Sequence, residues 1–145
     1  MGQSNQIELT SLLIFYIDKH ELCLDMKDLV KIMDPPVLDM SDEKDMLWEH
    51  GGIIFTVINL HKLFNVKNNG LTFQSKLILL EIKEKTVCFL VDKVIEMIAS
   101  TEKSSESRVF IPSTDPNLKG VIQYEGREIL VPNFDSMVNG HTNKY

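Results

Sequence analysis

Residues 51–64 read GGIIFTVINLHKLF, and this stretch indicates more about the fold than any other part of the chain. Its opening glycine pair suits a tight turn, and the run from Ile53 to Ile58 is rich in the β-branched and aromatic residues that favour strands. Asn59 then stands where a helix cap is expected, because its side chain can accept a hydrogen bond from a free backbone N–H. We therefore predict a turn, a buried strand and a short helix in succession.

The composition is that of an ordinary globular domain. The chain has 145 residues, of which 43% are hydrophobic and 25% are charged, so we expect a single folded unit with its own core. Its net charge is −6, and a protein with this balance repels nucleic acid and anionic membrane surfaces. We accordingly expect no nucleic-acid partner.

The location is predicted from what the chain contains. Cys23 and Cys88 each lie in an apolar run and are expected to be buried free thiols, which suits a reducing compartment. No apolar run reaches the roughly 18 residues of a membrane helix, and residues 1–10 do not resemble a signal peptide. A cytoplasmic protein without membrane insertion is the expectation.

Strand pairs joined by polar turns dominate the rest of the chain. We expect hairpins from residues 12–17 with 22–24, 77–82 with 86–91, and 120–124 with 128–131, and a further strand over 94–98. Many short strands without a strand–helix–strand alternation favour a mainly β protein built of small closed barrels. Residues 1–10 are expected to be a flexible leader, 11–138 a single domain and 139–145 a mobile tail.

Short helices are predicted between these strands. Asp25 is suited to cap a helix over residues 26–33, in which Leu29, Ile32 and Met33 would share one face. Residues 34–49 are strongly acidic and are expected to form a solvated connection, with a helical turn around 42–48. A closing helical turn is expected over residues 134–138.

Motifs of catalysis and of metal binding are not recognisable. His20, His50, His61 and His141 show no i, i+4 spacing, and the acidic residues around Asp42 lack the glycine and the final glutamate of a calcium loop. Neither an activated serine motif nor a phosphate-binding glycine loop is present. We predict a non-enzymatic protein without metal or cofactor.

Four segments in a fixed order carry a resemblance to a known family. They are LVKI at residues 29–32, EHGGIIFTVINL at 49–60, VDKV at 91–94, and Gly120–Val121 followed by a hairpin and a short helix. In this order the chain resembles the CheW-like family of bacterial chemotaxis adaptors. The resemblance implies two small five-stranded SH3-like β-barrels packed together, with short helices. It also implies a non-catalytic adaptor that couples the cytoplasmic tip of a chemoreceptor to the regulatory domain of a CheA-type histidine kinase.

Three positions depart from the family pattern. Gly51 stands where the family has an arginine, Thr56 where it has a proline, and Lys31 where it has an acid. The first change removes a planar cation that can pair with a carboxylate, and the last inverts a charge.

Partner contacts are expected from residues of these motifs. Leu29 and Ile32 can be either core residues or anchors in a groove, and Trp48 can be either a binding hot spot or a lid over the core. Asp92 is expected to brace the backbone near Val94, and Gly51 and Gly52 to form turns. The candidate protein-binding residues are Leu29, Lys31, Ile32, Trp48, Gly51, Gly52, Asp92, Val94 and Gly120.

Two other functions remain open on the sequence. One is an adaptor in a different signalling pathway, and the other is a small-ligand binding protein that uses the groove between the two lobes. A deep apolar pocket with convergent polar groups would favour the ligand, whereas shallow exposed apolar patches would favour protein docking.

Overall fold

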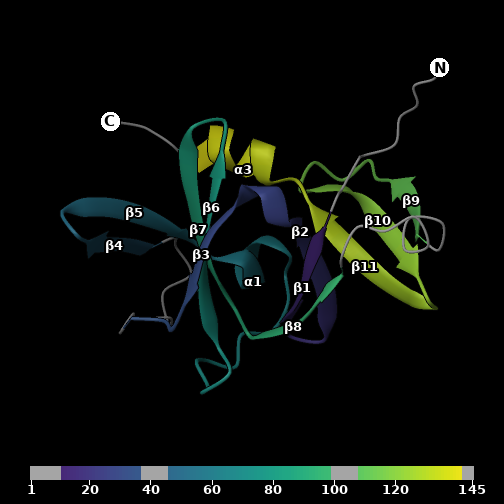
Figure 1. The fold of residues 1–145 in the computed structure, drawn as a ribbon, viewed down its shortest axis with the longest axis horizontal. Coiled ribbons are helices and arrows are strands. Elements are labelled where there is room, and N and C mark those ends of the chain that lie inside the picture. Colours follow the sequence, from purple (N-terminus) through teal and green to yellow (C-terminus); the bar gives the residue numbers. More distant parts are fainter. Residues whose placement is uncertain (1–10, 37–45, 99–107, 142–145) are drawn as a thin grey trace.

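Two β-sheets lie side by side in the computed structural model, which describes residues 11–36, 46–98 and 108–141 (Figure 1). The strands and helices are β1 (Leu12–Ile17), β2 (His20–Asp25), β3 (Leu29–Met33), β4 (Met46–His50), β5 (Ile53–Ile58), α1 (Leu60–Leu63), β6 (Lys76–Ile82), β7 (Lys85–Val91), β8 (Lys93–Ile98), β9 (Arg108–Pro112), β10 (Leu118–Tyr124), β11 (Arg127–Pro132) and α3 (Phe134–His141). A single 3₁₀ turn, η1 (Met26–Asp28), joins β2 to β3. The predicted mainly β fold with short helices is confirmed.

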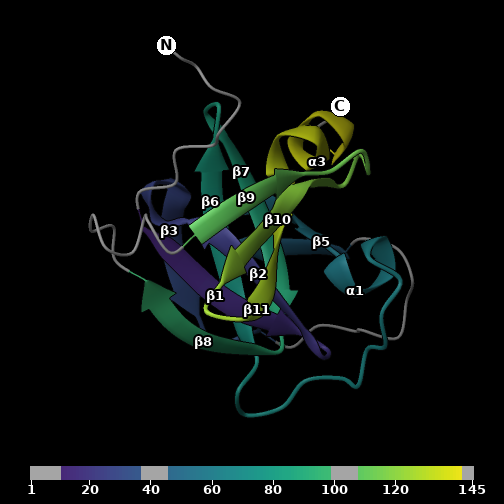
Figure 2. The ribbon, with the colours of Figure 1, turned by 90° about the vertical axis from the view of Figure 1, so that its right-hand side faces the viewer.

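Each sheet forms one lobe, and the chain passes between the lobes more than once. The first sheet has the strand order β8-β1-β2-β11-β10-β9, and the second has β3-β6-β7-β5-β4. The first sheet therefore has six strands where five were expected. Its additional strand is β9, which the sequence analysis did not predict. Figure 2 shows β9, β10 and β11 running together in front of β7.

A shared hydrophobic core lies between the two sheets. It takes Phe15 and its i±2 neighbours from β1, and Phe89 and its i±2 neighbours from β7. Leu12 and Ile14 of β1 belong to a second cluster inside the first lobe, and Cys88 and Leu90 of β7 belong to a third inside the second lobe. Because side chains alternate across a strand, a strand covered on both faces must be apolar at nearly every position. That requirement explains the uninterrupted runs LLIFYI and VCFLV.

Helix α3 follows β11 and covers the shared core from one side. Phe134 stacks on Phe89 with ring centroids 5.1 Å apart, and Met137 belongs to the same cluster. Asn133 caps the helix, since its side chain accepts a hydrogen bond from the N–H of Ser136 at 3.2 Å. The predicted closing turn over residues 134–138 is confirmed and continues to His141. The expected leader lies outside the described residues, as do the last four residues of the expected tail.

The predicted helix over residues 26–33 is wrong. The cap at Asp25 is present, because its side chain accepts from the N–H of Lys27, but only the single turn η1 follows and the chain then extends as β3. Leu29 and Met33 are four residues apart, a spacing that places residues on one face of a strand as well as of a helix. Pairing with β6 decides between the two, and β-branched Val30 and Ile32 suit the strand.

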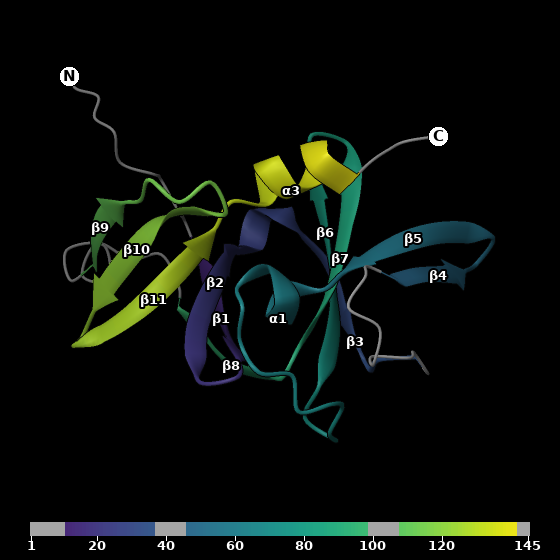
Figure 3. The same ribbon diagram turned by 180° about the vertical axis from the view of Figure 1, so that it is seen from behind.

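The hairpin of β4 and β5 corrects two further expectations. Residues 46–50 form a strand, so the predicted helical turn around 42–48 is wrong for residues 46–48, and its first residues lie outside the described part of the chain. The strand over 53–58 is present, yet only Val57 and Ile58 are buried. Its first half projects away from the body of the protein with β4 (Figure 3).

Asn59 caps α1 as predicted, accepting from the N–H of Lys62 at 3.1 Å.

Both cysteines are buried free thiols, as expected. No helix among the described residues is long and apolar enough to cross a membrane.

Candidate functional site

The first candidate surface is the projecting β4–β5 hairpin. Its turn residues Gly51 and Gly52 have φ angles of +62° and +81°, a backbone conformation that residues with a side chain rarely adopt. Leu47, Ile53 and Ile54 are all exposed, with 71% of Leu47 and 66% of Ile54 open to solvent. We call Leu47, Ile53 and Ile54 the hairpin-end surface.

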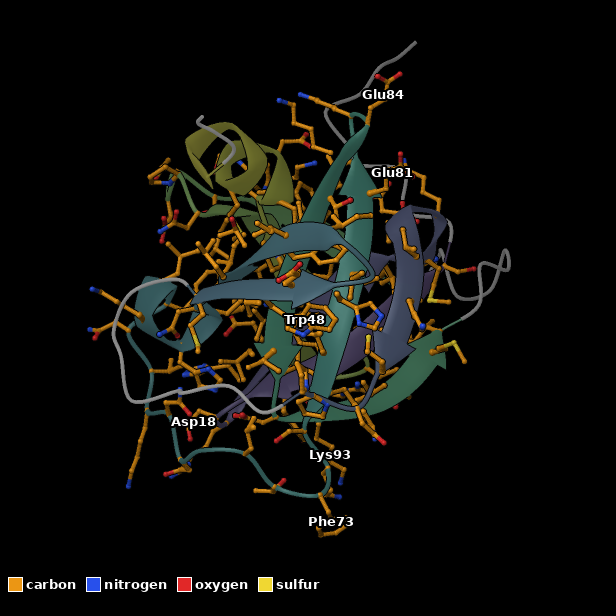
Figure 4. All side chains as sticks on the ribbon, turned by 90° about the vertical axis from the view of Figure 1, so that its left-hand side faces the viewer. Asp18, Trp48, Phe73, Glu81, Glu84 and Lys93 are labelled. Atoms are coloured by element: carbon orange, nitrogen blue, oxygen red, sulfur yellow. The ribbon has the colours of Figure 1, made fainter. Side chains whose placement is uncertain are left out.

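Trp48 lies on the same face of this hairpin as Ile53, opposite to the face that carries Leu47 and Ile54. Its ring stacks on His50 at 4.8 Å between centroids and tilts against Phe55 at 5.4 Å. Trp48 also packs on the cluster of Cys88 and Leu90 inside the second lobe, beneath the hairpin in Figure 4. The indole is therefore a partly exposed lid over that core, the second of the two roles expected for it.

A second candidate surface lies on β9, at the opposite end of the long axis from the hairpin (Figure 1). Val109 and Ile111 are exposed on one face of this strand, and we call them the β9-end surface. Phe110 points inward and lies over Gly120, where a Cβ atom would clash with the Phe110 ring and the Ile111 carbonyl oxygen. Gly120, a residue of β10, is thus covered by β9. Its lack of a side chain lets the two strands lie close together.

Strand β3 forms an edge of the second sheet and carries three exposed residues in succession. Val30, Lys31 and Ile32 face solvent, whereas Leu29 packs against the shared core. Of the two roles expected for Leu29 and Ile32, the structure places Leu29 with the core and leaves Ile32 partly open. Lys31 presents its charge on this edge.

Asp92 joins the two lobes where β7 passes into β8. One of its carboxylate oxygens accepts from the backbone N–H of Asp18 at 2.6 Å, and both lie near His61 Nε2, at 3.0 and 3.1 Å. Burial raises the pKa of Asp92, but the hydrogen bonds with His61 and Asp18 outweigh it and leave the pKa below its usual range. Asp92 braces the backbone of the β1–β2 turn, so the expected bracing near Val94 is wrong.

Arg127 makes a second polar link, within the first lobe. Its guanidinium donates to Glu21 at 2.8 and 3.1 Å and to Glu96 at 3.4 Å, and lies 5.8 Å from the Tyr124 ring centroid. The contacts tie β11, β2 and β8 together. Sequence alone did not indicate this network, because its members are up to 106 residues apart.

The nine candidate residues do not form one site. Trp48, Gly51 and Gly52 come together on the β4–β5 hairpin, and Lys31 and Ile32 lie on β3. Asp92 lies at the seam of the lobes, with Val94 packed against the shared core. Leu29 and Gly120 are in structural positions.

Several exposed apolar residues were missed by the sequence analysis. Ile53 and Ile54 were expected to be buried, and Val109 and Ile111 lie in a strand that was not predicted. Phe73 is 91% exposed, at the tip of the loop before β6 (Figure 4). The short run of β-branched and aromatic residues VFI at 109–111 was the one signal that could have indicated β9.

Comparison with known proteins agrees with this architecture. A family model described as CheW-like domain matches residues 11–141. The chain belongs to the CheW-like domain family. The match contains all the described strands and all nine candidate residues, and the family is one of chemotaxis adaptors.

A solved structure shares the fold. The scaffolding protein TtCheW from Thermoanaerobacter tengcongensis superposes with a TM-score of 0.70 at 19% sequence identity, over 92% of this chain and 90% of that one. No curated protein matches the chain. The CheW-like fold expected from the sequence is thereby confirmed, with its two sheets as the two lobes.

Proposed function

We propose that this CheW-like protein is a non-catalytic cytoplasmic adaptor that holds a CheA-type histidine kinase and a chemoreceptor tip in one assembly. The proposal rests on one observation. Exposed apolar side chains are present at both ends of the long axis, on the hairpin-end surface and on the β9-end surface. An adaptor needs two separate docking surfaces, so that both partners can bind at once.

The chemistry of both surfaces suits polypeptide partners. Each combines exposed aliphatic side chains with an edge strand, β4 in the second sheet and β9 in the first. An edge strand can pair with a strand of a partner, while its apolar side chains provide burial. Held this way, two partners meet at a raised effective concentration. Ile32 and Lys31 lie on β3, at the other edge of the second sheet. They would give the partner bound to that sheet a further contact.

The departures at Gly51 and Lys31 bear on which partner is chosen. Gly51 has a positive φ, so the turn itself favours glycine where the family pattern has arginine. The charge of Lys31 makes a partner with an acidic patch opposite β3 the better match, whereas the loss of the arginine removes a cation that could pair with a carboxylate opposite the hairpin. A homologous kinase and receptor from the same cell are therefore the partners to test. An adaptor in another signalling pathway remains the alternative.

Binding of a metabolite in the groove is less well supported. A pocket of about 90 Å³ lies at the seam of the lobes, whereas sites for drug-sized ligands measure roughly 300–1,000 Å³. Shallow exposed apolar surfaces dominate the ends of the described structure instead. They favour docking of proteins.

The test is a pair of reciprocal substitutions. Ile54→Asp alters the hairpin end and Val109→Asp the β9 end, and both residues are exposed, so neither change should unfold the protein. Affinities for a purified kinase regulatory domain and a receptor-tip fragment are measured for each variant. Losing one buried aliphatic side chain costs roughly 1.5–3 kcal/mol, so we expect Kd for one partner to rise about 10-fold or more.

Each variant is the control for the other. The proposal predicts that Ile54→Asp weakens one partner and Val109→Asp the other, with the remaining affinity unchanged. A Trp48→Ala variant tests separately whether the exposed part of the indole contributes. Failure of the folded wild-type protein to bind either partner would refute the proposal.

A further inference from the structure

A small pocket lies where the two lobes meet beside the start of α3. Its volume is about 90 Å³. The end of β2, the turn η1, the end of β11 and the first residues of α3 supply most of its wall, and Ile82 of β6 closes it from the second lobe. The apolar part of the wall includes Leu24, Val131 and Phe134. Figure 3 shows α3 and the segment after β2 close together at this seam.

Asp25 contributes to this pocket an oxygen that has no hydrogen-bond partner. The residue is only 7% exposed, and its Oδ1 accepts from the backbone N–H of Lys27 at 3.0 Å. Its Oδ2 is buried and has no hydrogen-bond partner. The Lys27 ammonium forms an ion pair with Oδ2 at 3.7 Å, but this distance is beyond hydrogen bonding and the lysine side chain is largely exposed. Buried polar atoms are normally hydrogen-bonded, so this oxygen indicates a donor that enters from outside.

The other charges around the pocket favour a cationic donor. Three carboxylates line it, from Asp25, Asp28 and Asp135, against the two ammonium groups of Lys27 and Lys119. Lys119 is paired with Asp135 at 3.5 Å. Desolvation raises the pKa of Asp28 most, and the neighbouring charge of Asp25 raises it further. A positive group near Asp28 and Asp25 would therefore be stabilised by both.

The chemistry of the wall selects the type of cation. Among the described residues, no three His, Cys, Asp or Glu side chains are placed to hold a metal ion. Cys23 also lines the pocket, and burial raises the pKa of its thiol to about 12, so it is a neutral thiol and not a metal-binding thiolate. Apolar walls around a carboxylate suit an organic cation whose methylene stem contacts Val131 and Phe134.

We propose that this pocket binds a guanidinium or primary ammonium group on an aliphatic stem, which donates a hydrogen bond to Asp25 Oδ2. The group comes either from an arginine or lysine side chain of a polypeptide or from a free polyamine. The proposal does not depend on the adaptor role, because it rests on the pocket alone.

The experiment is a titration followed by amide NMR of the ¹⁵N-labelled full chain. Nα-acetyl-arginine amide represents a polypeptide side chain, and spermidine represents a free polyamine. We expect saturable shifts of amide signals from residues that line the pocket. In Asp25→Asn the Kd should rise about tenfold or more, because the amide nitrogen replaces an acceptor with a donor while the Lys27 N–H can keep its partner.

Asp115→Asn is the matched control. Asp115 makes the same type of turn contact as Asp25, accepting from the N–H two residues ahead at 2.8 Å, but it is exposed and outside the pocket. Its substitution should leave the Kd unchanged. Saturation by the arginine derivative alone assigns a polypeptide source, and saturation by spermidine alone assigns a polyamine. Saturation by both supports the pocket, with the lower Kd indicating the source.

A second measurement does not depend on how the variant folds. Carboxyl ¹³C NMR of the wild-type protein follows the titration of Asp28 with and without the probe. A cation in the pocket should lower the pKa of Asp28. The proposal is overturned if neither probe gives saturable shifts, if Asp25→Asn binds as well as wild type, or if the pKa of Asp28 stays in place at saturation.

Discussion

Removing the Asp92 side chain should destabilise the protein by loosening the seam between its lobes. Asp92→Ala deletes the acceptor of the Asp18 N–H and the partner of His61 Nε2. His61 is only 3% exposed, so water cannot easily replace the lost contact, whereas the carboxylate itself is 28% exposed. Hydrogen bonds to charged groups contribute roughly 1.5–3 kcal/mol each, and allowing for this exposure we expect a loss of about 2–4 kcal/mol.

The pH dependence gives the same contact a second test. The folded pKa of Asp92 is lower than its unfolded pKa, so its ionised form stabilises the fold. This stabilisation is fully present above the unfolded value of about 3.9 and is lost as pH falls through the folded value. Asp92→Asn lacks it at every pH. The difference in free energy of unfolding between wild type and Asp92→Asn should therefore be largest above pH ~5 and should narrow below pH ~4.

Urea unfolding measured by fluorescence provides the assay, because Trp48 is the only tryptophan of the chain and lies partly buried in the second lobe. Asp34→Asn is a suitable control. Asp34 pairs with Lys76 at 2.8 Å on the surface, where an ion pair contributes about 0–1 kcal/mol. If Asp92→Ala costs no more than Asp34→Asn, or if the gap to Asp92→Asn widens as pH falls, the seam contact has been misjudged.

Two further predictions concern the core. Gly120→Ala places a methyl group about where the Phe110 ring now lies, since the added Cβ would meet Phe110 Cζ at 2.5 Å, and we expect a loss of about 1–3 kcal/mol by urea unfolding. An unchanged midpoint would show that β9 can move away from β10 at little cost. The thiols of Cys23 and Cys88 have pKa values raised to about 12 by burial, so iodoacetamide at pH ~8 should label them only when the chain unfolds. Rapid labelling of either cysteine in the folded protein would contradict that placement.

Local patterns predicted the elements whose own residues decide their structure. Asn59 is a cap, and the glycines at 51 and 52 form a turn, because both depend on side chains and φ angles within a few residues. The three predicted hairpins and the buried cysteines follow from apolar runs. Family resemblance then supplied the pairing of the two lobes, which no local pattern contains.

The errors arise where a distant strand decides. Residues 29–33 fit a helix and a strand equally well by spacing, and pairing with β6, about 50 residues later, selects the strand. Ile53 and Ile54 have the composition of a buried strand but belong to a hairpin that projects beyond its sheet. The contact of Asp92 with Asp18 spans 74 residues, so its role at the seam could not be read from VDKV alone.

The candidate surfaces show the same limit. Trp48 and the glycine turn were identified, yet the exposed residues beside them were assigned to the core. An exposed isoleucine and a buried one look alike in sequence when polar residues do not alternate with the apolar residues of their strand. Burial in this fold is set by how far each strand extends past its neighbours.

The parallel pairing of β2 with β11 has a consequence for synthesis of the protein. The first sheet draws β1 and β2 from the beginning of the chain and β10 and β11 from its end. While the ribosome is still translating, the early hairpin has only part of its sheet, and the face of β1 that carries Leu12 and Ile14 lacks its contacts with β10 and β11 until those strands emerge. The first sheet can therefore be completed only after β11 has been synthesised, and pairing between strands so far apart in sequence slows folding.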